Sequence, residues 1–212
     1  MKIFKNFISF EGIDFSGKTT QIHLLLENLK MYNFHPLVVR EPGGTKISEK
    51  IRDILLSPAN HEIFRKTELL LYEAARSQLV HQMILPALKE DKFVIVDRFY
   101  DSTTAYQGFG RNLDIEVIKI LNSFATSGLK PYKTFFIDIS PEESERRRIH
   151  NKHEQDRLEK GGIDFFNKIR QGFLQLCIEE PKRFVKINGE RKSEEISNEI
   201  WNIMKTHWPI RK

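Results

Sequence analysis

The stretch that decides the fold reads Gly12-Ile13-Asp14-Phe15-Ser16-Gly17-Lys18-Thr19. It follows the apolar, β-type run Ile3–Phe10 and opens the segment Thr19–Tyr32, whose leucines recur at helical spacing. The pattern G-x-x-x-x-G-K-[ST] between a strand and a helix is typical of a P-loop, in which glycines let backbone N–H groups turn toward phosphate oxygens. The sequence therefore predicts a nucleotide phosphate site. The alternative is a structural glycine turn beside an ordinary surface lysine.

The residues expected to contact ATP lie in one segment: Gly12, Ile13, Asp14, Phe15, Ser16, Gly17, Lys18, Thr19 and Thr20. Lys18 would neutralise charge on the β- and γ-phosphates, and the Thr19 hydroxyl would bind Mg²⁺. Asp97 directly follows the apolar run Phe93–Val96, where a P-loop protein carries a second group that holds the metal, usually through water. Together these two features favour Mg·ATP or Mg·GTP as the ligand.

The chain alternates short apolar runs of β type with longer helical patterns. The expected strands are Ile3–Phe10, Leu37–Arg40, Phe93–Val96, Thr134–Ile139 and Phe184–Ile187. The expected helices are Thr19–Tyr32, Lys46–Leu56, Thr67–Lys89, Asp114–Thr126, one that begins at Pro141, Asp164–Glu179 and Ser193–His207. Apolar strands separated by helices predict a parallel sheet covered on both faces. We therefore expect an α/β fold of the P-loop NTPase type, with three α/β/α layers, a five-stranded parallel sheet and one domain over residues 1–212.

Charge and composition narrow the class of ligand. The 34 basic residues exceed the 29 acidic ones, for a formal net charge of +5, which suits nucleic acid, a membrane surface or a small phosphorylated ligand. No apolar run approaches the roughly 18 residues that span a bilayer. A basic helix-turn-helix and a stacking platform for bases are both missing from the sequence. The single cysteine, Cys177, excludes an internal disulfide framework and suits the cytoplasm. We expect neither nucleic acid nor membrane as a partner, and a P-loop protein that uses its charge on DNA is the alternative.

Further segments carry a family resemblance: Phe10–Asp14, Arg40–Thr45, Ala74–Arg76, Asp97–Phe99, Asp101–Gly108, Asp156–Glu159 and Phe165-Phe166. Together with the P-loop, the sequence resembles the bacterial type of thymidylate kinase, a family of P-loop nucleoside monophosphate kinases. The resemblance implies transfer of the γ-phosphoryl group of ATP to dTMP, giving dTDP and ADP in dTTP biosynthesis, with Mg²⁺ as cofactor and a homodimer as the assembly. A GTPase is not favoured, because the base-reading N-K-x-D motif is absent. A related kinase that acts on another monophosphate or on a nucleoside is the nearest alternative.

The resemblance also implies a set of residues for the acceptor. The dTMP site would comprise Asp14, Glu41, Pro42, Arg52, Tyr72, Arg76, Arg98, Ser102, Thr103, Tyr106 and Gln107. Arg98, helped by Arg52, would grip the dTMP phosphate, because a guanidinium can meet two phosphate oxygens at once. Tyr72 stands where relatives commonly carry Phe and would stack on thymine, while Arg76, four residues later on the same helix face, would bond its O4.

Other positions of this site have more specific implied roles. Gln107 would bond the base edge, and Ser102 and Thr103 would line the base pocket. Tyr106 would pack on the deoxyribose and disfavour a ribose, whereas Asp14 would accept a hydrogen bond from the sugar 3′-OH. The Glu41-Pro42 bond is a candidate for the cis form.

Phosphoryl transfer to a nucleoside monophosphate requires positioned cations rather than a general base. A phosphate monoester has a second pKa of about 6, so its attacking oxygen is already ionised at neutral pH. The implied catalytic residues are Lys18, Arg98, Arg148, Lys152 and Arg157, and the implied metal-binding residues are Thr19, Asp97 and Glu41.

Three of those cations belong to an expected lid over residues 146–162. Its core, Arg146–Arg157, is rich in Lys and Arg, and a solvated charged helix end is the alternative interpretation. Some relatives carry an arginine where this chain has Phe15, and bacterial forms supply that cation from the lid instead. The positions of the key lid arginine hold Lys152 or His153 here, so which cation reaches the γ-phosphate stays open.

Overall fold

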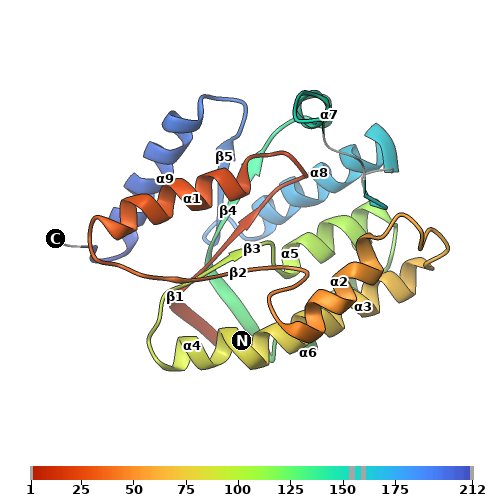
Figure 1. Cartoon of the computed structure of the whole chain (residues 1–212), viewed down its shortest axis with the longest axis horizontal. Helices are drawn as coiled ribbons and strands as arrows, with labels where there is room; N and C mark the ends of the chain where they lie inside the picture. Colours follow the sequence, from red (N-terminus) through yellow and green to blue (C-terminus); the bar gives the residue numbers. More distant parts are fainter. Residues whose placement is uncertain (1, 153–155, 159–160, 211–212) are drawn as a thin grey trace.

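The computed structural model describes residues 2–152, 156–158 and 161–210 (Figure 1). Residues 153–155 and 159–160 of the expected lid, and with them His153, lie outside the described residues. No helix in these described ranges combines the length and the apolar character that a membrane crossing requires.

A five-stranded sheet forms the middle layer. Its strands run in the order β2-β3-β1-β4-β5, and every neighbouring pair is parallel. The strands are β1 (Lys2–Glu11), β2 (Leu37–Arg40), β3 (Val94–Asp97), β4 (Leu129–Asp138) and β5 (Phe184–Asn188). The expected parallel α/β sheet is confirmed.

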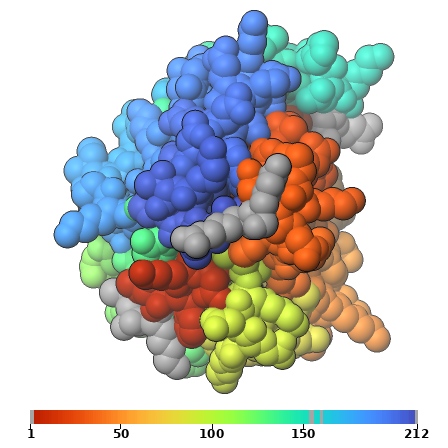
Figure 2. All heavy atoms as spheres, turned by 90° about the vertical axis from the view of Figure 1, so that its left-hand side faces the viewer, coloured from red at the N-terminus to blue at the C-terminus, as the bar shows by residue number. Residues whose placement is uncertain are grey.

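Helices cover both faces of this sheet, which completes the three layers (Figure 1). On one face lie α1 (Lys18–Lys30) and α9 (Ser193–His207), which pack side by side (Figure 2). The other face carries a continuous helix over residues 65–89 and a second helical layer over residues 100–110 and 162–179. The first consists of α3 (Arg65–Leu79), η1 (Val80–Ile84) and α4 (Leu85–Lys89), the second of α5 (Tyr100–Thr103), η2 (Thr104–Gly110) and α8 (Gly162–Glu179). The remaining helices are α2 (Lys46–Leu56), α6 (Ile115–Ala125) and α7 (Pro141–His150).

Successive strand residues explain why the sheet needs two covers. Phe10 and Ile95 pack into the core beneath α1 and α9, whereas Phe7, Val94 and Val96 pack beneath the long helix on the opposite face. All five side chains are fully buried. Because side chains alternate across a strand, a wholly apolar strand is stable only when both faces are covered.

Two elements differ from the sequence expectation. Residues 100–110 are helical, although their glycines and threonines show no apolar helical period, and the sequence analysis assigns no helix there. β4 begins at Leu129 rather than Thr134, because Leu129–Pro131 pair with Lys2–Phe4 of β1, ahead of a register shift between Phe4 and Ile8. The polar and Pro-containing start of β4 therefore pairs beyond an irregularity that apolar patterning does not reveal.

Candidate active site

The P-loop joins the end of β1 to the start of α1, and two of its glycines are required by geometry. Gly12 has φ 146°, and a Cβ there would lie 2.5 Å from the Ile137 carbonyl oxygen. Gly17 has φ 97° and caps the N-terminus of α1. Side-chain-bearing residues rarely adopt such angles, so the loop keeps its backbone close to β4 and opens its N–H groups toward an anion.

Lys18 is the first residue of α1, and its side chain folds back over the loop. The ammonium donates to the carbonyl oxygens of Gly12 (3.1 Å) and Ile13 (2.8 Å), and its side chain is buried. Burial, with the positive charge of Arg98 second, lowers the pKa of Lys18 to about 8. Phosphate oxygens at this point would supply the negative charge that favours the protonated ammonium.

Thr19 and Asp97 meet at the carboxyl end of the sheet. The Thr19 hydroxyl donates to Asp97 Oδ2 at 2.8 Å, which links α1 to the end of β3. Hydroxyl and carboxylate oxygens are the donors that Mg²⁺ prefers, so this pair fits a P-loop metal. Glu41, the third expected metal ligand, lies on the neighbouring strand end, where its N–H donates to the Asp97 carbonyl oxygen. Its carboxylate, however, is directed to Arg76 (2.8 Å).

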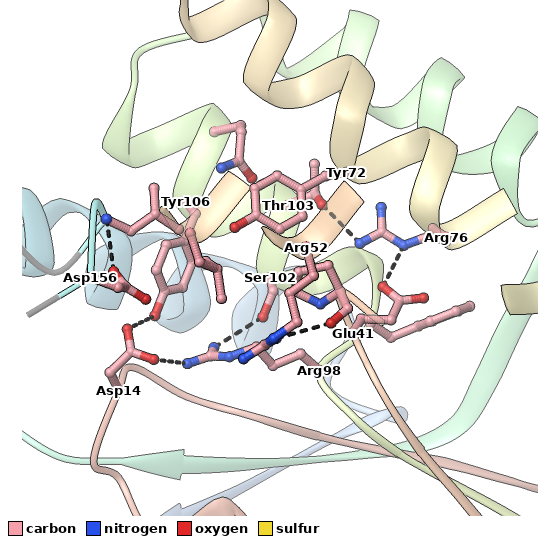
Figure 3. Close-up of a pocket in the computed structure, with 15 residues that line it drawn as sticks. Asp14, Glu41, Arg52, Tyr72, Arg76, Arg98, Ser102, Thr103, Tyr106 and Asp156 are labelled. Carbon is pink, nitrogen blue, oxygen red and sulfur yellow. Dashed lines mark hydrogen bonds and ion pairs between the residues drawn. The ribbon is translucent and has the colours of Figure 1, made fainter. Parts of the chain in front are cut away.

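A cavity opens beside the P-loop. Its lining includes every residue that the sequence analysis assigned to dTMP, from Asp14 to Gln107, drawn from the P-loop, the β2 loop, α2, α3 and the helix over residues 100–110 (Figure 3). It adds Leu56, Phe99, Asp156 and Leu158, which the sequence analysis did not assign to this site.

Arg98 occupies the junction between this cavity and the P-loop (Figure 3). It donates to Asp14 Oδ1 and to the Gly12 carbonyl oxygen, both at 2.6 Å, and lies over the Tyr106 ring. Tyr106 in turn donates to Asp14 Oδ2 at 2.8 Å. Burial alone would raise the pKa of Asp14, but Arg98 and Lys18 lower it, so the carboxylate is ionised. A single guanidinium is thus fixed between the two regions where phosphates are expected.

Arg76 is the other fixed cation, with its side chain only 2% exposed. Its Nε donates to Glu41 (2.8 Å), its Nη1 to Glu73 (2.8 Å) and Asn122 (3.1 Å), and its Nη2 to Thr103 (2.9 Å). An arginine has five N–H donors, so among the described residues these bonds leave one Nη2 proton at the cavity. Burial raises the pKa of Glu41 to about 7 despite this contact.

The sequence analysis missed both Glu73 and Asn122. Glu73 lies three residues before Arg76 on α3, a spacing that could have indicated the pair, whereas Asn122 on α6 carries no local signal. Arg52 extends from α2 to the same region and donates to the Pro42 carbonyl oxygen at 2.9 Å, after a Glu41-Pro42 bond that is cis.

Comparison with known proteins shows to which family the chain belongs. A family model described as thymidylate kinase matches residues 10–200. The chain belongs to the thymidylate kinase family. It is 50% identical over 201 residues to a thymidylate kinase of Thermoanaerobacter pseudethanolicus, covering 95% of this chain and 98% of that one. It is 52% identical over 183 residues to one from Caldanaerobacter subterraneus, covering 86% of each chain. The crystal structure of thymidylate kinase from Ehrlichia chaffeensis superposes with a TM-score of 0.76 at 33% identity, covering 94% of this chain and 97% of that one.

For this thymidylate kinase family member, the expected lid cations lie in different settings. Arg148 pairs with Glu145 (2.7 Å) on α7 and lines a hollow with Asp14 and Phe15, next to the P-loop. Lys152 is exposed in the turn after α7. Arg157 is held away from the P-loop, with Nη1 on Glu68 of α3 at 2.6 Å and Nε on the Leu55 carbonyl oxygen of α2 at 2.7 Å. In this arrangement Arg157 joins the lid chain to α2 and α3, and its implied catalytic role stays a prediction.

Among the described lid residues, Arg147 contacts the P-loop backbone, and the sequence analysis did not single it out. Its Nη1 donates to the Phe15 carbonyl oxygen (3.2 Å), and its Nη2 donates to the Gly189 carbonyl oxygen (2.8 Å) in the turn after β5. Glu143, one helical turn earlier, orients its Nε at 2.6 Å. Three consecutive arginines give no sequence signal for which one turns inward.

Proposed function

We infer that this chain is an ATP-dependent dTMP kinase, which transfers the γ-phosphoryl group of ATP to dTMP and releases dTDP and ADP. The observation that carries this inference is the adjacency of the two sites: Asp14 belongs both to the P-loop and to the lining of the acceptor cavity, and Arg98 spans them. A donor phosphate on the loop and an acceptor phosphate in the cavity would then meet at one cation.

The residues supply positioning and charge neutralisation. Backbone N–H groups of the P-loop and Lys18 would hold the β- and γ-phosphates of ATP, while Arg98 and Arg52 would hold the dTMP phosphate in line with them. The acceptor phosphate is ionised at neutral pH, so its oxygen needs no general base. Of the three lid cations that the sequence analysis named, Arg148 is the one that lines a hollow with the P-loop residues Asp14 and Phe15, next to Arg147, which contacts the loop backbone.

Mg²⁺ is the metal that we propose, held by Thr19 and Asp97, and when bound it would screen the charge of the β- and γ-phosphates. We assign the enzyme to the cytoplasm, where ATP is available and where the single cysteine, Cys177, stays reduced.

A coupled assay of ADP release tests the activity. The purified chain with Mg²⁺ and ATP should turn over dTMP far faster than dCMP, and should leave thymidine unphosphorylated. Some turnover of dUMP is expected, because recognition of one methyl group contributes roughly 1 kcal/mol. A preference for thymidine over dTMP would overturn the assignment to a monophosphate. Salt-sensitive binding of oligonucleotides without any dTMP-dependent ADP release would instead favour the DNA-binding alternative.

We also propose a homodimer, formed through α2, α3 and α6. These helices pack against one another and expose apolar side chains: Ile47 and Ile54 on α2, Leu70 on α3, and Val117, Ile120 and Phe124 on α6. Residues 117, 120 and 124 share one helix face. Exposed apolar side chains gathered on neighbouring helices are typical of a protein interface.

Phe124→Lys tests this interface, because Phe124 is 82% exposed in the single chain. Light scattering should give twice the 25.0 kDa chain mass for the unmodified protein and a single chain mass for the variant. The matched control is Ile178→Lys on α8, which introduces the same charge at a 73% exposed isoleucine on a helix outside the proposed interface. A dimer that survives Phe124→Lys but dissociates with Ile178→Lys would move the interface to α8.

A further inference from the structure

Glu68 is a buried carboxylate at the start of α3 that contacts Gln107 of the acceptor cavity, Arg111 and the lid residue Arg157. It is 1% exposed, and both of its oxygens accept hydrogen bonds. Oε1 accepts from Gln107 Nε2 (2.9 Å) and Arg111 Nε (3.2 Å), and Oε2 accepts from Arg111 Nη2 (3.2 Å) and Arg157 Nη1 (2.6 Å). None of the sequence motifs points to this residue.

The two arginines keep Glu68 charged. Burial would raise its pKa, but the hydrogen bond from Gln107 and the charges of Arg111 and Arg157 lower it. An ionised carboxylate accepts hydrogen bonds and donates none. The Gln107 amide can therefore approach Glu68 only through its NH₂ group.

This contact determines which end of the Gln107 amide is left for a ligand. Gln107 is 1% exposed and lines the acceptor cavity. With Nε2 on Glu68, its Oε1 is the group that remains for the cavity, so Gln107 presents a hydrogen-bond acceptor. Arg76, on the next turns of α3, presents a donor through its remaining Nη2 proton, since its other bonds go to Glu41, Glu73, Asn122 and Thr103.

A donor beside an acceptor is the complement of a thymine edge. Thymine offers O4 as an acceptor and N3–H as a donor, and uracil offers the same pair. Cytosine offers the reverse, an N4 amino donor and an N3 acceptor, so donor would face donor and acceptor would face acceptor. Buried polar groups left unpaired in this way reject a ligand strongly.

We propose that Glu68 is the positioning residue for pyrimidine specificity: by holding the Gln107 amide nitrogen, it turns the amide oxygen toward the base and so selects thymine over cytosine. The proposal rests on the proposed function, since it presumes that the cavity binds dTMP. It also gives Arg157 a role, because this lid residue helps to keep Glu68 ionised.

Glu68→Gln is the direct test, because it keeps the shape of the side chain but replaces a carboxylate, which only accepts hydrogen bonds, with an amide that can also donate. The Gln107 amide can then turn over, so the ratio of kcat/KM for dTMP to that for dCMP should fall by about ten- to hundredfold. The ratio of dTMP to dUMP should stay unchanged, because both bases present the same edge. An equal loss for dTMP, dUMP and dCMP would mean a purely structural role and would overturn the proposal.

Matched variants separate this effect from general damage. Glu180→Gln removes another carboxylate that pairs with two cations, Lys130 and Arg183, none of which lines the acceptor cavity, and should leave all ratios unchanged. In a double-mutant cycle, Glu68→Gln added to Gln107→Met should not change the dTMP to dCMP ratio further. An additional, independent loss in the double variant would show that Glu68 does not act through Gln107.

A second carboxylate variant keeps the test usable if Glu68→Gln is too unstable to purify. Glu68→Asp retains the charge for both arginines but is one methylene shorter, so it should lose the contact with Gln107 and change the same ratio. A wild-type enzyme that turns over dTMP and dCMP equally would defeat the proposed function itself, whereas intact wild-type selectivity that Glu68→Asp leaves unaltered would defeat only the role of Glu68.

Discussion

Lys18→Ala should lower kcat by roughly a thousandfold or more at saturating dTMP, since the substitution removes the cation placed at the β- and γ-phosphates. The fold should survive. The Gly12 carbonyl oxygen also accepts from Arg98, and the Ile13 carbonyl oxygen also accepts from the Ser16 N–H, so neither is left unpaired. Steady-state ADP release, together with thermal denaturation, measures both consequences.

Lys30→Ala is the matched control for this experiment. Lys30 ends the same helix, α1, and is exposed to solvent, so its removal should leave kcat and the melting temperature essentially unchanged. A wild-type rate for Lys18→Ala would exclude the P-loop as the donor site. A large drop in melting temperature for Lys18→Ala would assign the lost activity to unfolding.

The sheet and its covers could be predicted from sequence because its strands contain apolar runs whose side chains fall on both faces. Phe93–Val96 has no polar position, which requires a cover on each side, and the P-loop marks the β1 to α1 turn. The helix over residues 100–110 could not be predicted in the same way. Its side chains Thr103, Tyr106 and Gln107 line the cavity. Because these positions are polar or aromatic, the segment lacks the apolar helical period of a helix that packs on a core.

The residues that line the acceptor cavity could be predicted from motifs, but the carboxylate partners of its cations could not. Two cations of the cavity have carboxylate partners from other elements, Glu41 for Arg76 and Asp14 for Arg98, whereas Glu73 pairs with Arg76 from the same helix. Arg157 is likewise held by Glu68, 89 residues earlier. Pairings between distant elements depend on tertiary packing, which residue types alone do not reveal. The sequence therefore suggested that Arg157 is a free lid cation, whereas in the structure it is paired with Glu68.

Arg98→Ala should lower kcat/KM for dTMP by about a thousandfold, with a rise in the dTMP KM and a fall in kcat, because a phosphate contact at the junction both binds and aligns the acceptor. Two neighbouring side chains each lose a contact at once. Asp14 loses the shorter of its side-chain bonds and keeps only Tyr106, and Tyr106 loses the guanidinium over its ring. The KM for ATP should change little, because Lys18 and the loop backbone remain.

Arg98→Lys decides whether charge or geometry matters at this position. A lysine keeps the positive charge beside Asp14 but cannot reach Gly12, Asp14 and two phosphate oxygens from one planar group. We therefore expect Arg98→Lys to resemble Arg98→Ala in kcat and to recover only part of the dTMP KM. Arg170→Ala, which breaks an arginine–carboxylate pair with Asp138 on β4, is the control and should leave the dTMP KM unchanged. Full recovery of kcat and of the dTMP KM in Arg98→Lys would mean that only the positive charge of Arg98 matters. The alignment of the two phosphates would then depend on Arg52 and the P-loop.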